Sequence, residues 1–330
     1  MNTENRETLF MPVTKLHKVY APQLYEFKSK SVDISCTPNH KLLLEKRYKT
    51  KNTRIFVDDN KDKPYWKQNN GQRYFRRADE VYKQKHDFIP LTSNYIGGLQ
   101  PKKIYGFKAE DFMEFLGWFV SEGYHSGKTG DRRIGICQSK TANPQKWKEI
   151  KEMLLRMNLN VTYNSGSFNF GVTQLPKKMF EELWKLGKAH EKYIPQKYLN
   201  YSEILLNYLF NSLISGDGCI VERPGKIDKI AYFTVSKRLA DNFQELTQKC
   251  GFRATISKQH YTNGKWRDLY RINVGFKEKA QVACLDKKIV DYNDYAYCVT
   301  TPYHSLYTRR NGIACWIGNT ASWGSTADTT

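Results

Sequence analysis

The chain has 330 residues, of which 53 are lysine or arginine and 33 are aspartate or glutamate, so its formal net charge is +20. This length predicts about two domains, and a hydrophobic content of 40% excludes a disordered chain. The sequence has neither an apolar run of membrane-spanning length nor a signal-peptide core, so no membrane partner is expected. The excess of basic residues predicts a polyanionic partner, most simply nucleic acid.

The seven cysteines are odd in number and form no Cys-x-x-Cys pair. This pattern argues against a disulfide framework and against a structural zinc site. A reducing compartment therefore suits the chain best, and we expect it to act in the cytoplasm of a bacterium or archaeon, or as a phage-encoded protein there.

Taken in order, the elements change character twice along the chain. Short strands are predicted over 13–36, a polar loop over 46–74 and a strand over 87–91, and Gly97-Gly98 marks a boundary. Residues 109–284 carry longer helical patterns. Strands return from 297 to 316, with an Asn311-Gly312 hairpin signal. A β-rich region on both sides of an α/β region predicts one domain inserted into another.

The central region contains an internal repeat. Segments 111–123 and 206–218 are apolar almost all round, which predicts buried helices, and small residues in both let helix backbones approach closely. Each segment ends in an acid and a glycine, Glu122-Gly123 and Asp217-Gly218, and these glycines suit the left-handed position after a helix. A carboxylate is unfavourable at the negative end of a helix, so two in matching places predict a compensating cation.

The likeness between the two copies continues downstream. A Ser-Lys pair follows each acid, with Lys140 in the first copy and Lys237 in the second, and an amphipathic helix and a strand come next. One carboxylate and one lysine per copy is a specific pattern. The alternative is a structural duplication whose acids are ordinary surface residues.

The two helices resemble the paired motifs of LAGLIDADG homing endonucleases in their single-chain, pseudo-dimeric form. The resemblance implies a two-lobed, pseudo-symmetric α/β domain of αββαββα-like order over 105–287, with repeats at about 105–195 and 196–287. It implies a monomer that cuts double-stranded DNA at a long, specific site. The match is looser at Phe115 and Phe210, where leucine is usual.

The same resemblance assigns roles to four residues. It implies that Glu122 and Asp217 bind Mg²⁺ beside the scissile phosphates, and that Lys140 and Lys237 assist near the cleavage centre. Mg²⁺ favours one or two carboxylates together with substrate phosphates, so the residue types suit this chemistry. Basic and aromatic residues that alternate over 261–271, together with Arg132 and Arg133, suit a β-surface in a DNA groove.

The flanking regions resemble inteins. Thr37-Pro38-Asn39-His40 is similar to the Thr-x-x-His motif of that family, and residues 77–90 are similar to the strand that follows it. Residues 297–304 resemble the C-terminal intein region, and Gly318-Asn319-Thr320 resembles the splice junction. Each motif alone is more often a turn. Their order around an endonuclease implies a mostly β, Hint-type splicing domain built from 1–104 and 288–319, with 320–330 as extein.

The intein resemblance implies splicing roles that need no cofactor. Asn319 would cyclise and cut the bond to Thr320, whose hydroxyl would accept the upstream acyl group. His304 would assist, because Gly318 stands where the family usually has histidine. The remaining implied roles are Thr37 and His40 at the upstream junction and Cys298 as a helper. Cys36 and Cys315 are expected to be buried structural thiols, because free cysteine is among the most buried residue types.

One departure from the intein pattern is large. The family begins with a Cys- or Ser-led motif, and no such motif occurs in this sequence. We therefore expect either a split intein, whose partner is a complementary N-terminal fragment with its extein, or a truncated chain. Two other interpretations stay open: a DNA-binding or maturase-like protein without catalysis, and a splicing module with a decayed endonuclease.

Overall fold

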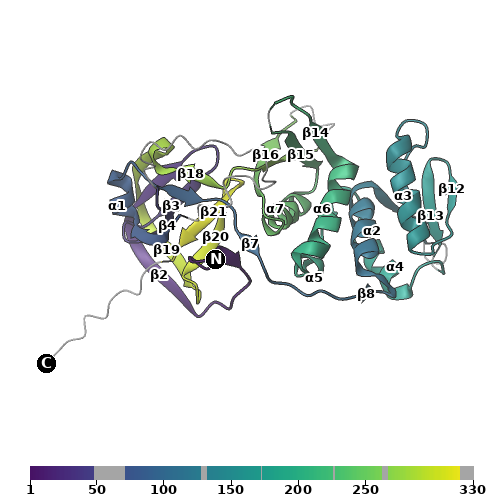
Figure 1. The fold of residues 1–330 in the computed structure, drawn as a ribbon, viewed down its shortest axis with the longest axis horizontal. Coiled ribbons are helices and arrows are strands. Elements are labelled where there is room, and N and C mark those ends of the chain that lie inside the picture. Colours follow the sequence, from purple (N-terminus) through teal and green to yellow (C-terminus); the bar gives the residue numbers. More distant parts are fainter. Residues whose placement is uncertain (48–70, 128–131, 172, 226, 262–266, 320–330) are drawn as a thin grey trace, which may run out of the picture. The chain divides into compact units, whose positions relative to one another are not determined.

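The computed structural model describes residues 1–47, 71–127, 132–171, 173–225, 227–261 and 267–319 (Figure 1). It divides into two compact units, one formed by residues 1–94 and 277–330 and the other by residues 95–276. The first unit is discontinuous in sequence, and the whole second unit is inserted between its parts. Among the described residues, no helix has the length and apolar character needed to cross a bilayer.

The unit boundaries lie earlier than the sequence boundaries at 104 and 287. Tyr95 and Ile104 are buried in the core of the second unit, which draws residues 95–104 into it. At the other end, β18 (Lys279–Gln281) pairs with β6 (Phe88–Pro90), so residues after 276 belong to the first unit.

The second unit consists of two similar halves in which the order helix–strand–strand–helix–strand–strand recurs, as predicted. The first half contains α2 (Ala109–Glu122), β10 (Gly123–Ser126), β11 (Arg133–Cys137), α3 (Pro144–Arg156), β12 (Thr162–Asn164), β13 (Ser167–Gly171), α4 (Lys177–Trp184) and α5 (Gln196–Leu199). The second contains α6 (Glu203–Asp217), β14 (Gly218–Val221), β15 (Lys229–Thr234), α7 (Lys237–Lys249), β16 (Arg253–Gln259) and β17 (Leu269–Gly275). A short hairpin, β8 (Lys103–Ile104) and β9 (Phe107–Lys108), precedes α2. Both sheets are antiparallel, with strand orders β10-β11-β13-β12 and β14-β15-β17-β16.

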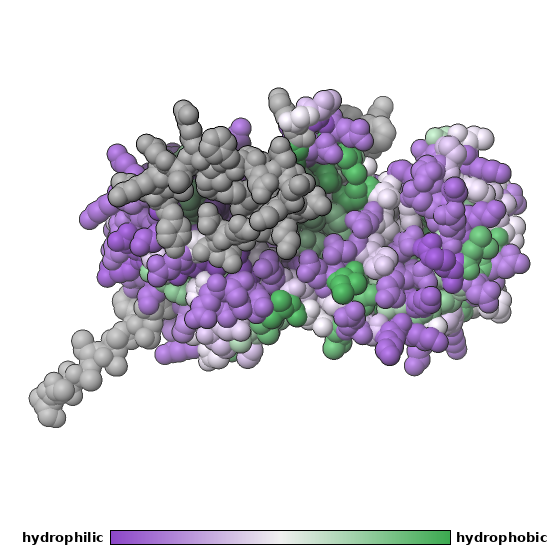
Figure 2. Space-filling model, viewed as in Figure 1, coloured by the Kyte–Doolittle hydropathy of each residue, from purple (hydrophilic) through white to green (hydrophobic). Residues whose placement is uncertain are grey.

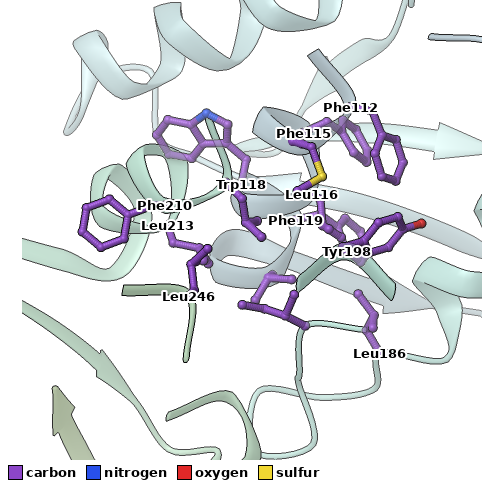
Figure 3. Packing of buried hydrophobic residues seen from close by; sticks show 14 of the residues in the cluster. Phe112, Phe115, Leu116, Trp118, Phe119, Leu186, Tyr198, Phe210, Leu213 and Leu246 are labelled. Carbon is purple, nitrogen blue, oxygen red and sulfur yellow. The ribbon is translucent and has the colours of Figure 1, made fainter. Parts of the chain in front are cut away.

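Large apolar side chains from both halves form one core around the motif helices. Figure 3 shows Phe115, Trp118 and Phe119 of α2 near Phe210 and Leu213 of α6, and all five are buried. The apolar residues of α2 and α6 lie on several sides of each helix. This is the pattern of a buried helix, as the sequence predicted, and not that of a helix with one exposed face. Around α3 and β12 the visible surface is mostly hydrophilic (Figure 2).

Helices α2 and α6 pack against each other through small residues at matching positions of the repeat. A methyl group added at Gly117 would lie 1.9 Å from the Ser212 Oγ atom, and one added at Gly216 would lie 2.4 Å from the Ser121 Cβ atom. Gly117 corresponds to Ser212 in the repeat, and Ser121 corresponds to Gly216, so each position contacts its own counterpart. That is the contact pattern of a two-fold axis.

This close approach makes Gly117 a sensitive position. We expect Gly117→Ala to lower the free energy of unfolding of the second unit by about 1–3 kcal/mol, since overpacking a tight contact costs that much. Urea denaturation of the full chain measures it. Gly171→Ala is the control, because its added methyl group would meet only the Gln174 Oε1 atom at 3.5 Å. An equal loss in both variants would contradict a tight helix contact.

In its described residues, the first unit is mostly β. Its strands are β1 (Glu7–Thr8), β2 (Lys15–Lys28), β3 (Asp33–Cys36), β4 (Lys41–Glu45), β5 (Arg73–Arg77), β6, β7 (Asn94–Tyr95), β18, β19 (Asp286–Thr300), β20 (Ser305–Arg310) and β21 (Ile313–Gly318), and its helices are α1 (Ala78–Lys83) and the 3₁₀ turn Val282–Cys284. Phe27, Leu42 and Ile89 are fully buried in its core. The strand at 87–91 is confirmed by β6. The Asn311-Gly312 hairpin is confirmed too, with positive φ angles of 50° and 77° at its two central residues.

Two local predictions in the first unit are wrong. Residues 15–28 form one long strand instead of short ones, because a bulge in β19 between Asp291 and Asp294 lies opposite Pro22, where a ladder bond is lost. Residues 78–83 form α1 and do not continue the strand expected over 77–90. The loop predicted over 46–74 lies mostly outside the described residues, and its end at 73–74 belongs to β5.

Candidate functional site

Two acids occupy matching ends of the motif helices in the second unit. Glu122 is the last residue of α2, and Asp217 is the last residue of α6. The glycines that follow are not left-handed as predicted, since their φ angles are −79° and −89°. They are required for space instead: a methyl group at Gly123 would lie 2.2 Å from the Phe119 carbonyl oxygen, and one at Gly218 would lie 2.3 Å from that of Ile214.

The two carboxylates influence each other electrostatically. Burial raises the pKa of Asp217 to about 7, and the charge of Glu122 is the next cause. Burial also raises the pKa of Glu122, against the opposing charge of Lys146 and a hydrogen bond from Gln138. That bond joins Gln138 Nε2 to the Glu122 Oε1 atom at 3.4 Å. The helix ends thus gather two half-buried carboxylates in one place, as a cation site requires.

The structure does not bring the two predicted lysines to the acids. Lys237 is exposed and binds the Asp241 carboxylate one turn along α7, at 2.6 Å and 2.5 Å from its two oxygens. Lys140 is exposed too, and its ammonium lies 4.9 Å from the centre of the Trp147 ring. Lys140 and Lys237 each lie three positions after the end of a strand. Their side chains, however, contact neighbouring residues, the Trp147 ring and the Asp241 carboxylate.

Two other lysines lie at the ends of the motif helices. Lys192, only 3% exposed, donates hydrogen bonds to the carbonyl oxygens of Phe119, at 2.7 Å, and of Gly123 at the end of α2. Lys146 donates to the Gly216 carbonyl at the end of α6, at 2.9 Å. Burial lowers the pKa of Lys192 to about 8, and the charges of Asp217 and then Glu122 oppose that shift. Because 53 residues of the chain are lysine or arginine, no local pattern singles out these two.

Two carboxylates fit part of the ligand set of a divalent cation such as Mg²⁺. No cluster of three or more His, Cys, Asp or Glu side chains able to hold a metal occurs within the described ranges. Glu122 and Asp217 would supply two carboxylates to such an ion, and oxygen ligands from outside the chain would complete its coordination. Mg²⁺ prefers such a set to an all-protein cage.

The predicted DNA-facing residues are only partly described. Arg132 binds the Glu181 carboxylate and lies over the Trp184 ring, at 5.3 Å from its centre. Arg271 lies on β17, with its guanidinium 5.8 Å from the centre of the Phe233 ring. Lys265 and Trp266 lie outside the described residues.

In the first unit, Asn319 and His304 lie side by side. The Asn319 side-chain nitrogen is 3.3 Å from the His304 Nδ1 atom, and the Asn319 backbone N–H donates to the His304 carbonyl at 3.1 Å. Asn319 is only 3% exposed. His304 has a φ angle of 53°, a costly conformation for a residue with a side chain. Thr320 lies outside the described residues.

His40 reaches the same place from the other end of the sequence. Its ring hydrogen-bonds the backbone carbonyl of Gly318, and burial lowers its pKa to about 4, so the imidazole is neutral at physiological pH. Thr37 starts the turn, since the His40 N–H donates to the Thr37 carbonyl at 3.0 Å. A methyl group at Gly318 would lie 2.4 Å from the Lys41 carbonyl oxygen. A histidine at 318 would therefore require this backbone to shift.

Cys298 lies on β19 and lines a cavity of about 570 Å³ together with Thr37 and His40. The two thiols expected to be structural are both buried, and burial raises the pKa of Cys315 to about 12 and that of Cys36 further. Cys36 and Cys298 both line this cavity.

Known proteins resemble the chain in several ways. It is 23% identical to the ATP-dependent Clp protease proteolytic subunit of Chlamydomonas moewusii over 335 aligned positions, which cover 96% of this chain and 31% of that protein. It is 32% identical over 110 residues to the replicative DNA helicase DnaB of Synechocystis sp. (strain PCC 6803), covering 32% of this chain and 12% of that one. The chain thus spans less than a third of the length of these curated relatives.

A solved structure, the crystal structure of I-DmoI in complex with DNA and Mn, aligns with 51% of this chain and 90% of that one, at 12% identity and a TM-score of 0.34. The model of the LAGLIDADG-like domain family matches residues 205–284. That match contains most of α6, the acid Asp217 and the strands that follow. Residues 205–284, which include most of the second half of the inserted unit, are therefore similar to a LAGLIDADG-like domain.

Proposed function

We propose that this chain is an intein-type splicing element whose inserted unit is a DNA endonuclease. The observation that carries the proposal is the placement of two sets of residues. His40, His304 and Asn319, from opposite ends of the sequence, meet at one point of the discontinuous unit. Glu122 and Asp217 end the two motif helices of the inserted unit.

The endonuclease proposal assigns the acids to metal binding. Mg²⁺, when bound, polarises a phosphoryl oxygen and acidifies water. Burial and mutual repulsion disfavour the charged forms of Glu122 and Asp217, and the ammonium groups of Lys192 and Lys146 offset part of that effect. Lys192 also offers a cation near the point where negative charge develops during cleavage. DNA is supported as the substrate by the basic charge and by the LAGLIDADG-like match.

The splicing proposal assigns cyclisation to Asn319. Its side-chain nitrogen attacks its own backbone carbonyl carbon, a succinimide forms, and the bond to Thr320 breaks. His304 Nδ1, at 3.3 Å, is placed to take the proton that the attacking nitrogen loses and to return it to the leaving amine of Thr320. His40, neutral at the Gly318 carbonyl, is placed to donate a hydrogen bond to the peptide next to the one that breaks.

The upstream half of splicing needs a Cys- or Ser-led segment that the sequence does not contain. We propose that a complementary segment supplies this nucleophile and pairs with the β unit as an added strand. Thr37 and His40 then act on its junction, with Cys298 as a helper at the cavity they share.

The relatives support the insertion part of the proposal. A protease subunit and a replicative helicase have unrelated functions by name, yet both match this chain over a minority of their own lengths. A stretch that recurs in proteins of unrelated function is what an insert produces. A DNA-binding protein without catalysis accounts less well for the two acids, because binding does not require carboxylates at both helix ends.

DNA binding is tested by its salt dependence. If about six phosphates are contacted, the affinity should fall about a thousandfold between 50 and 200 mM salt, linearly on logarithmic axes. Fluorescence anisotropy with a labelled duplex measures this. A flat response over the same range would mean that the charge of +20 serves another purpose.

A further inference from the structure

The end of α6 is held by a side chain from the other repeat. The last carbonyls of a helix have no partner within it and must bind elsewhere. The Gly216 carbonyl accepts its hydrogen bond from Lys146, the third residue of α3, at 2.9 Å. The bond joins residues 70 positions apart and connects the first repeat to the helix end that carries Asp217.

Helix α3 is well anchored to act as a support. Arg156, its last residue, donates to the Asp111 carboxylate in the first turn of α2 at 2.8 Å. Ile150 and Met153, on the buried face of α3, are fully buried in the core. The helix is therefore fixed along its length to the first repeat, and Lys146 extends from its N-terminal end to α6.

The bond lies beside one of the tight contacts between the two motif helices. Gly216 faces Ser121 across the helix contact, and the Glu122 Cγ atom is 3.9 Å from the position of a methyl group added at Gly216. Lys146 thus holds the backbone beside Asp217, while its charge also acts on the Glu122 carboxylate. Lys192 does the reverse. It donates hydrogen bonds to backbone carbonyls at the end of α2, next to Glu122, and its strongest charge interaction is with Asp217.

We propose that Lys146 is a positioning residue, which fixes the end of α6 to the first repeat and so sets the relative position of Glu122 and Asp217. This inference rests on the proposed endonuclease function for its catalytic consequence. The structural part of the inference, that Lys146 fixes the end of α6, does not depend on that function. Lys146 contacts no reacting atom, and its positioning effect acts through the Gly216 backbone, in addition to the effect of its charge on the two acids.

The test compares Lys146→Met, Lys146→Arg and the matched control Lys148→Met. Lys148 lies on the same helix, is exposed and pairs with Glu152 one turn away, at 3.8 Å, so its removal costs the same charge. We expect Lys146→Met to slow single-turnover cleavage about 100-fold, as a displacement near 1 Å can do. Its DNA affinity and melting temperature should match those of Lys148→Met. Lys146→Arg, which keeps a donor, should restore most of the rate.

Hydrogen exchange supplies a readout that needs no cleavage. The Gly218 N–H, bound to the Ile214 carbonyl, should exchange faster in Lys146→Met and unchanged in Lys148→Met. Unchanged exchange in Lys146→Met would overturn the proposal, as would a wild-type cleavage rate or an equal loss in Lys148→Met. A loss of affinity as large as the loss of rate would also overturn it, since that marks a phosphate contact. If the wild-type chain cuts no DNA, the endonuclease proposal fails, and exchange alone then decides the role of Lys146.

Discussion

A chain carrying Glu122→Gln or Asp217→Asn should bind its target duplex almost as tightly as the wild type and fail to cut it. Either amide keeps the shape of the acid and removes a charge that a divalent cation needs. Losing about 4 kcal/mol of charge stabilisation in the transition state slows cleavage roughly a thousandfold. Phosphate contacts, which these substitutions leave intact, dominate affinity. Rates and affinities on one plasmid-borne site measure both quantities.

The Asp217→Asn chain also has an expected stability signature. The folded-state pKa of Asp217 is raised to about 7 from an ordinary value near 3.8, so its ionisation opposes folding. The wild-type chain should therefore lose stability as pH rises from about 4 to 7, and Asp217→Asn should lose less. Asp241→Asn is the matched control, because that acid binds Lys237 away from the site. Wild-type cutting by either site variant would refute the metal-ligand assignment.

Replacing Asn319 with alanine should abolish release of residues 320–330 and stop any ligation to Thr320. Alanine has no nitrogen that can attack the backbone carbonyl, so no succinimide forms. His304→Ala should slow the same release by about 10²–10⁴-fold, the usual contribution of a general acid–base group. Mass spectrometry of the chain, incubated with and without a peptide bearing a Cys- or Ser-led intein segment, follows both steps.

The expected products differ between the two incubations. Without the added segment, the wild-type chain should release the tail slowly and ligate nothing. With it, the chain should join the upstream extein to Thr320, and Asn319→Ala should stop after the upstream thioester or ester has formed. Asn5→Ala, at an exposed asparagine that bonds Glu7, should behave like the wild type. Ligated product from Asn319→Ala would contradict the mechanism.

The sequence predicted the elements that local patterns determine. The motif helices were predictable because each carries apolar residues all round, and the acids at their ends because the repeat places one in each copy. The Asn311-Gly312 turn was predictable because its two residues adopt positive φ angles readily. Periodicity and turn chemistry report the conformation of a residue and of its near neighbours. The motif helices and the turn are determined by such local information alone.

The partners of the acids could not be predicted, because they depend on contacts between distant segments. Lys146 and Gly216 are 70 residues apart, and Lys192 and Phe119 are 73 apart. The lysines with matching sequence positions, Lys140 and Lys237, are exposed and have other neighbours. The sequence singled out Gly123, Gly218 and Gly318. The physical reason for glycine at these positions is that backbone carbonyl oxygens lie too close for a side chain, and sequence patterns do not reveal such contacts.

The most direct test of the central claim is selection of cleaved sites from a randomised plasmid library by the purified chain. With Mg²⁺, the wild-type chain should enrich one long site cut on both strands. With a chelator, or with Glu122→Gln and Asp217→Asn combined, it should enrich none. Equal enrichment by the doubly substituted chain, or cleavage that persists in the chelator, would contradict a metal-dependent endonuclease built on the two helix-end acids.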